Sequence, residues 1–138
     1  MPITPLGLDP TLCFIGGAWV PSLEAGRLSL LNPSDGSHLC EIARGSDADI
    51  DRAVQAASAA LVGDWGRATA AERGRVLAKI GQGVLDHVDE LTQLEALDVG
   101  KPLKQARADV LALARYMEFY AGACDKLHGE TIPYLDGY

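Results

Sequence analysis

The residue types that most often perform catalysis are present in this chain, but they do not converge in its sequence. Cys13, Cys40 and Cys124 are far apart and odd in number, and no CxxC pair or His–Cys cluster suggests a metal site or a disulfide framework. We therefore expect three reduced and mostly buried thiols, as is typical of a cytoplasmic protein.

The histidines and carboxylates show no arrangement suited to acid–base catalysis. The histidines fall in or near turns and a helix end without a neighbouring cysteine or serine motif, so we expect surface or capping roles rather than a general base. Three clustered acidic residues mark the start of a helix, where the helix dipole favours anions. The side chains considered are His38, His87, His128, Asp47, Asp49, Asp51 and Glu118.

Nucleotide-binding signatures are incomplete as well. No GxGxxG follows a predicted strand. Gly100 and Lys101 resemble the tail of a phosphate-binding loop, but the earlier glycine and the following Ser or Thr are missing. The residues on their own therefore indicate no complete active site, no catalytic residue and no cofactor-binding residue.

The composition is that of a globular protein. The 138 residues suit a single domain, 48% are hydrophobic and 22% are charged. The net charge is −7 and the basic residues form no cluster, which excludes attraction to nucleic acid or to an anionic membrane. The start lacks a basic, apolar leader, and no window of about 18 apolar residues exists to cross a bilayer. We expect a cytoplasmic protein with no membrane contact.

The elements that would position a site begin with two short β-hairpins. Residues 1–11, with prolines at positions 2, 5 and 10, are expected to form a flexible N-terminal arm. Gly16-Gly17 predicts the turn of the first hairpin, and the turn residues at 32–36 predict that of the second. The predicted strands are 12–15, 18–20, 27–31 and 38–43.

About four α-helices are predicted to follow the hairpins. Ser46 can cap the first, which we expect to end at Gly63 with Trp65 in a linker. A capping box formed by Thr69 and Glu72 opens the second. The third and fourth are predicted from His87 to about Leu97 and from Pro102 to about Leu127, with Gly100 between them.

The apolar stripes of these helices have no obvious partner. The last helix has heptad-like spacing, but Ala106 and Tyr120 would be poor seam residues, so a helix lying across a core is favoured over a coiled coil. No strand–helix–strand unit is present to build a parallel sheet. Either the helices pack on one another as a bundle, or they cover structure that lies outside this chain.

Seven strings of the sequence, in order and at matching spacing, resemble the aldehyde dehydrogenase superfamily, in particular its betaine aldehyde dehydrogenase-like members. Each string is weak alone, but together they cover about residues 13–138. The strings are FIGGAWV at 14–20, LNPSDG at 31–36, AVQAA at 53–57, AERGRVL at 71–77, LEALDVGKP at 94–102, FYAG at 119–122 and DKLHGETIP at 125–133.

The resemblance implies the α/β fold of that family, with residues 12–138 as the N-terminal part of its NAD(P)-binding domain. The family oxidises aldehydes to carboxylic acids through a cysteine thioester, with NAD or NADP as the cofactor, and its complete members are homodimers or homotetramers. Its nucleophile, base, oxyanion-hole asparagine and cofactor-binding lysine come later than Tyr138, and Cys124 does not match the nucleophile's motif. The 138-residue chain is therefore expected to be truncated and inactive.

The resemblance also implies a monovalent cation site. Many members hold K⁺ or Na⁺ with two backbone carbonyls and one carboxylate, and the matching residues are Leu30, Leu31 and Asp98. A hard cation prefers oxygen ligands, and a carbonyl needs no particular side chain. For Asp98 the alternative is a helix-end residue that accepts backbone hydrogen bonds, and one side chain could do both.

A substrate tunnel is implied beside the last helix. Ala108 and Ala112, one turn apart, match positions that face the tunnel in relatives, and small residues there would admit a broader aldehyde. The alternative is that both alanines pack closely against another helix. The alternative for the whole chain is a non-catalytic helical module whose exposed stripes bind a partner.

Overall fold

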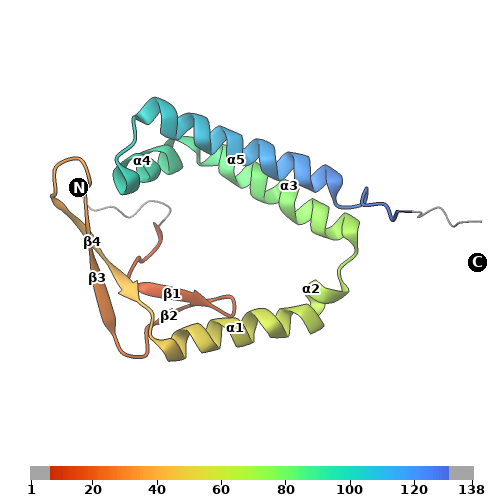
Figure 1. The fold of residues 1–138 in the computed structure, drawn as a ribbon, viewed down its shortest axis with the longest axis horizontal. Helices are drawn as coiled ribbons and strands as arrows, with labels where there is room; N and C mark the ends of the chain where they lie inside the picture. Colours follow the sequence, from red (N-terminus) through yellow and green to blue (C-terminus); the bar gives the residue numbers. More distant parts are fainter. Residues whose placement is uncertain (1–6, 131–138) are drawn as a thin grey trace, which may run out of the picture.

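The computed structural model describes residues 7–130, which form two β-hairpins and a set of helices (Figure 1). In the first hairpin, β1 (Leu12–Ile15) pairs antiparallel with β2 (Ala18–Pro21). Gly16 and Gly17 between them have φ values of 63° and 84°. Two consecutive positive φ angles define the tight turn that matches strand twist, and glycine adopts them without steric cost. The prediction of this hairpin is confirmed.

The second hairpin consists of β3 (Gly26–Leu31) and β4 (His38–Arg44), also antiparallel. The amide of Asn32 donates to the carbonyl of Ser37 (2.8 Å), and the Asn32 side chain accepts from the amide of Ser34 (2.9 Å). The ladder is irregular between Leu30 and Leu31, which is where the strand leaves regular pairing. Each sheet has two strands, and no parallel pair exists among the described residues.

Helix α1 (Asp47–Val62) begins at the predicted cap. Ser46 and Asp49 form a reciprocal capping box, so that two otherwise unpaired amides of the first turn are satisfied. A short helix, α2 (Asp64–Arg67), follows where only a linker around Trp65 was expected. That expectation was wrong because the Arg67 guanidinium holds one extra turn, donating to the Asp64 carboxylate (2.7 Å) and the Val62 carbonyl (3.1 Å).

Helix α3 (Ala70–Asp86) starts at the predicted capping box, in which the Thr69 amide donates to the Glu72 carboxylate at 2.7 Å. Helix α4 (Val88–Val99) ends at Gly100, whose φ of 71° is the left-handed conformation favoured after a helix end. Helix α5 (Leu103–Ala123) begins directly after Pro102.

The predicted extension of the last helix to Leu127 was wrong. After Ala123 the chain turns, and the amide of Lys126 donates to the Ala123 carbonyl at 3.0 Å. Leu127 is 89% exposed. Helix stability in proteins comes mainly from packing, so a terminal turn whose apolar residue is almost fully exposed has little to stabilise it.

Helices α3 and α5 lie side by side and antiparallel, with α4 packed against α5 (Figure 1). The close contact uses small residues, because a Cβ built at Gly74 would lie 2.7 Å from the carbonyl oxygen of Ala121. The small core is centred where the three helices meet. Its members are Val84, Val88, Val110 and Ala114, with Leu91 packed against them.

Many apolar side chains in the described part of the chain remain exposed, as the sequence predicted. Helix α1 lies apart from the α3–α5 pair (Figure 1), and its Ile50, Val54 and Leu61 are more than half exposed. On α5 the same holds for Tyr116 and Phe119. The helices therefore form only part of a bundle, and whole apolar faces have no partner within residues 7–130.

Candidate functional site

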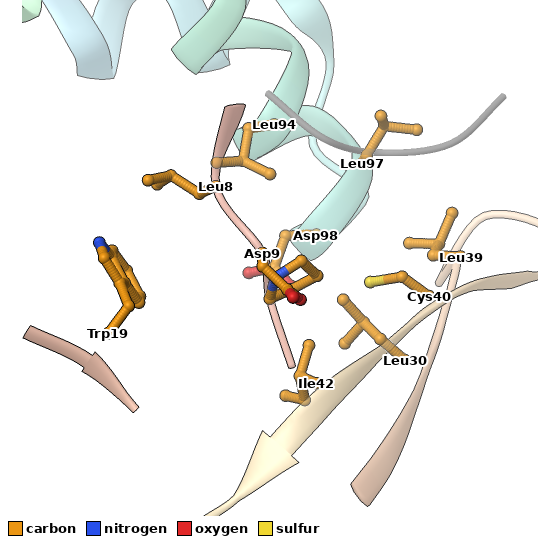
Figure 2. Close-up of a pocket in the computed structure, with 11 residues that line it drawn as sticks. Leu8, Asp9, Trp19, Leu30, Leu39, Cys40, Ile42, Leu94, Leu97 and Asp98 are labelled. Carbon is orange, nitrogen blue, oxygen red and sulfur yellow. The ribbon is translucent and has the colours of Figure 1, made fainter. Parts of the chain in front are cut away.

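A pocket of about 210 Å³ lies where the N-terminal segment, the β3–β4 hairpin and the end of α4 meet. Figure 2 shows that its lining comes from separate segments, with Leu30 and Cys40 on the hairpin and Leu94 and Leu97 on α4. Asp98 lines it too. The structure therefore brings together two of the three residues predicted to hold a cation, Leu30 and Asp98, although 68 positions separate them in the sequence.

The end of α4 is placed against the turn that follows β3. A Cβ at Gly100 would lie 2.9 Å from Cγ of Pro33, which is closer than side-chain carbons approach one another, so only glycine fits without a shift. Its left-handed φ adds a second reason for glycine. The contact between Gly100 and Pro33 fixes the distance between the β3 end and the last turn of α4.

The predicted carbonyl donors lie at the irregularity of the β3–β4 ladder. Leu30 pairs with Cys40 but Leu31 pairs with His38, so Leu39 is an extra residue on β4. A bulge of this kind bends the strand and disrupts the regular hydrogen bonds. The Leu31 side chain is 54% exposed and does not line the pocket. Because a cation would use its carbonyl, this neither supports nor opposes the assignment of Leu31.

The Asp98 side chain has no hydrogen-bond or ion-pair partner within residues 7–130 and is exposed. No backbone amide in this part of the chain donates to it, as the helix-end alternative would require. Among the same residues no group of three or more His, Cys, Asp or Glu could hold a metal ion. One carboxylate and two carbonyls are hard oxygen donors of the kind that a monovalent cation prefers, but the surface of the pocket that Leu30 and Asp98 share is almost entirely apolar.

The pocket contains a second carboxylate that the sequence did not single out. Asp9 lines it, and its Oδ1 accepts from the amide (2.9 Å) and hydroxyl (2.7 Å) of Thr11. These hydrogen bonds hold the pKa of Asp9 below its usual range. The carbonyl of Pro10 also accepts from the amide of Ala43 (2.9 Å), which attaches this segment to β4. The Asp-Pro-Thr sequence is a local turn signal that could have predicted that this segment has a defined structure.

Beside the pocket, Lys101 joins α4 to α5. Its Nζ donates to Oε1 of Glu95 (2.5 Å) and to Oδ2 of Asp109 (2.8 Å). Hydrogen bonds to Asp109 and Glu95 raise the pKa of Lys101, and those from Lys101 and Gln105 lower the pKa of Asp109. The carboxylates of Glu95 and Asp109 therefore favour the charged form of the Lys101 ammonium and hold it between α4 and α5.

Asp49 has a structural role larger than the helix-start position that was predicted. It is 2% exposed, and besides Ser46 it accepts from the hydroxyl of Ser22 (2.9 Å) and the amide of Leu23. Hydrogen bonding, first from the Ser46 amide, lowers its pKa to about 2 despite burial. Asp49 thereby ties the start of α1 to the segment after β2.

The two predicted tunnel residues lie on α5, on the side away from its packed face. The buried residues Ala106, Val110 and Ala114 recur every fourth position, and Ala108 and Ala112 are offset from them by two, or about 200°. Ala108 is exposed and Ala112 is half-buried. Their surface is therefore not the one that packs on α3 and α4.

The histidines and cysteines show local contacts. His38 pairs with Glu41 and His87 with Glu90, each at 3.0 Å and on the surface. The Cys124 thiol donates to the carbonyl of Tyr120 one turn earlier in the chain. In the described part of the chain no helix is long and apolar enough to span a membrane.

The comparisons with known proteins agree on one family. The sequence model of the aldehyde dehydrogenase family matches residues 19–138. Aldehyde dehydrogenase of Enchytraeus buchholzi is 38% identical over 135 residues, covering 96% of this chain and 27% of that protein. Hydroxyisobutyraldehyde dehydrogenase of Mycolicibacterium austroafricanum is 36% identical over 123 residues, covering 89% of this chain and 24% of that protein.

Solved structures agree with this fold. A Burkholderia cenocepacia protein, solved as a candidate aldehyde dehydrogenase, is 56% identical with a TM-score of 0.84, covering 90% of this chain and 26% of that one. A point mutant of betaine aldehyde dehydrogenase from Staphylococcus aureus, solved in complex with NAD⁺, is 30% identical with a TM-score of 0.87. The match covers 97% of this chain and 27% of that one. The chain spans about a quarter of the length of these relatives. It belongs to the aldehyde dehydrogenase family and has the fold of the N-terminal part of its members.

Proposed function

We propose that residues 12–138 are the N-terminal part of the NAD(P)-binding domain of an enzyme that oxidises an aldehyde to a carboxylic acid. NAD or NADP would accept the hydride. The observation that carries the proposal is the family match over residues 19–138, in a chain that spans only about a quarter of its relatives. NAD⁺ complexes of similar structures, including the Staphylococcus aureus enzyme, support the cofactor class.

The exposed apolar faces support the same proposal physically. Only five hydrophobic residues are buried among those described, whereas long stretches of α1 and α5 expose theirs. Exposed apolar area of this extent is unfavourable in water at roughly 25 cal/mol per Å². These faces are suited to cover a parallel sheet contributed by further residues of the same protein.

The residues described here supply no thiol–base pair, so we propose that the 138-residue chain alone does not oxidise aldehydes. The test is to follow NADH or NADPH formation by the absorbance at 340 nm, with NAD and with NADP as the cofactor and with small, branched and aromatic aldehydes as substrates. NAD(P)H formation by the isolated 138 residues would contradict this proposal. If the coding sequence continues past Tyr138, its product should be active, and inactivity with every aldehyde would count against the enzyme assignment.

We also propose that the Leu30 and Leu31 carbonyls and the Asp98 carboxylate hold K⁺ or Na⁺. Two observations support this proposal. Leu30 and Asp98 line the same pocket, and the Asp98 carboxylate has no hydrogen-bond or ion-pair partner within residues 7–130. The melting temperature in KCl or NaCl, compared with choline chloride at equal ionic strength, tests the site. The cation-dependent increase should disappear in Asp98→Asn.

Ala108 and Ala112 are proposed to border the substrate tunnel, because their side of α5 is not used against α3 or α4. Narrowing this surface with Ala112→Leu in the active protein should lower kcat/KM for branched and aromatic aldehydes more than for acetaldehyde. An equal effect on all aldehydes would instead indicate a packing role.

A non-catalytic helical interaction module is the second candidate, since exposed apolar stripes also suit a protein partner. Size-exclusion chromatography and a hydrophobic dye separate the two. A monodisperse chain that binds no dye would favour the module, and aggregation with dye binding would favour the enzyme part. For the complete enzyme we propose a cytoplasmic homodimer or homotetramer, although some relatives are mitochondrial by name.

A further inference from the structure

The turn between β3 and β4 carries an exposed Asp-Gly pair, Asp35-Gly36. In such a pair the glycine nitrogen can attack the protonated side-chain carboxyl of the aspartate, because glycine has no side chain to obstruct the approach. The new bond joins nitrogen to Cγ, water leaves with the carboxyl oxygen and the amide proton, and a cyclic succinimide forms. When water opens the ring at the main-chain carbonyl, the product is isoaspartate, in which the backbone runs through Cγ.

This modification would disrupt the turn, because it adds one carbon to the main chain. The turn is now closed by two backbone hydrogen bonds of 2.8 Å, from the Asn32 amide to the Ser37 carbonyl and from the Gly36 amide to the Asn32 carbonyl. Pro33 of the same turn lies against Gly100 at the end of α4. Isomerisation would therefore also disturb the contact between the hairpin and α4.

The folded turn holds both reacting groups in hydrogen bonds. Oδ1 of Asp35 accepts from the Ser37 amide (2.9 Å) and the Ser37 hydroxyl (2.6 Å), which restricts rotation of the carboxyl group. These bonds, the hydroxyl first, hold the pKa of Asp35 below its usual range, and an ionised carboxylate is a poor target for a nucleophile. The Gly36 N–H points to the Asn32 carbonyl.

We propose that Asp35 is a site of isoaspartate formation and that the hydrogen bonds from Ser37 suppress this modification in the folded protein. Ser37→Ala removes the hydroxyl bond and keeps the amide bond. It should accelerate isoaspartate formation by about 2- to 10-fold, the factor that corresponds to the net strength of one hydrogen bond. Ser37→Thr keeps a hydroxyl at the same position and should retain the slow rate.

The test measures isoaspartate after incubation of the folded chain at mildly acidic pH. Trypsin releases residues 28–44, in which Asp35 is the only aspartate. The isoaspartyl form of this peptide has the same mass, separates by reversed-phase chromatography and resists endoproteinase Asp-N. Ser34→Ala is the matched control, because the Ser34 hydroxyl makes no hydrogen bond within residues 7–130 and the two bonds to Asp35 remain.

The same variants are also incubated in guanidinium chloride, where the hydrogen bonds of the turn are lost. All should then convert at one common rate, faster than the folded protein. Asp136-Gly137, the other Asp-Gly pair of the sequence, lies outside the described residues and serves as a reference for conversion in the unfolded chain. Circular dichroism verifies that each variant is folded before incubation without denaturant.

The role of Ser37 is supported if Ser37→Ala accelerates conversion in the folded protein only, while Ser34→Ala does not. An unchanged rate in folded Ser37→Ala would overturn it. An equal acceleration in guanidinium chloride would also overturn it, because the effect would then come from the neighbouring residue type and not from the folded turn. Equal rates for the unchanged chain when folded and unfolded would show that the turn gives no protection.

Discussion

The closeness of the antiparallel contact between α3 and α5 can be tested by comparing the free energies of unfolding of two variants that carry substitutions on the same helix. Gly74 faces α5, and a Cβ there would lie 2.7 Å from the Ala121 carbonyl oxygen. Gly83 faces open space, and a Cβ there would meet no atom within 4 Å. Alanine is favoured over glycine inside a helix by about 0.8–1.0 kcal/mol at either position.

The difference between the two variants isolates the steric cost. Gly83→Ala should raise the free energy of unfolding by about 0.8–1.0 kcal/mol. At Gly74 the same gain is opposed by overlap with a backbone oxygen that cannot rotate away, and forcing extra volume into a packed contact costs about 1–3 kcal/mol. Because the helix propensities cancel, the two stabilities should differ by that same amount of about 1–3 kcal/mol.

Urea unfolding followed by circular dichroism at 222 nm provides the assay, with the two variants and the unchanged chain compared at equal m-value. Gly81→Ala gives an intermediate point, because its Cβ would lie 3.2 Å from Cβ of Met117 and 3.3 Å from the carbonyl oxygen of Ala114, which is tight but less so than the 2.7 Å approach at Gly74. The expected order of stability is Gly83→Ala, Gly81→Ala and then Gly74→Ala. Equal stabilisation by Gly74→Ala and Gly83→Ala would refute close packing of α3 on α5.

Three further predictions follow from other contacts. Gly100→Ala should lower the free energy of unfolding by about 1–2 kcal/mol because of the left-handed backbone alone. The overlap of the new Cβ with Pro33 should lower it further, and a lower urea midpoint would show the combined loss. The pKa of Asp49 falls from 3.8 to about 2 on folding, so the stabilisation of the folded state by its carboxylate is complete above pH 4 and disappears toward pH 2. The difference in melting temperature between the unchanged protein and Asp49→Asn should therefore shrink as the pH falls over that interval. Arg73→Lys should lose the two hydrogen bonds to the Trp65 and Gly66 carbonyls and the contact with the indole ring, costing about 1–3 kcal/mol, measured by tryptophan fluorescence during unfolding.

Much of the secondary structure followed from signals within a few residues. The helix cap at Ser46, the capping box at Thr69 and the turn at Gly16-Gly17 were predicted and are present. Each depends on hydrogen bonds or dihedral angles of residues no more than three or four apart, so the local sequence contains the whole cause. The family resemblance, read from seven strings, was likewise confirmed by the match over residues 19–138.

The errors and omissions concern contacts between distant residues. The end of α5 at Ala123 depended on whether Leu127 had a partner, which periodicity does not reveal. The burial of Asp49 depends on Ser22 and Leu23, more than 25 positions earlier. The spacing of helical residues identified Asp49 as a first-turn acid but gave no sign of the segment it binds.

The sequence by itself determined the order of hairpins and helices, the caps that begin them, the glycine turns and the family. Only the tertiary structure decided that Leu30 and Asp98 share a pocket, that Lys101 bridges Glu95 and Asp109, and that Gly74 serves a helix contact. The reason is physical. A local element is stabilised by groups adjacent in the chain, whereas a pocket or a helix crossing is stabilised by groups that become neighbours only after the chain has folded.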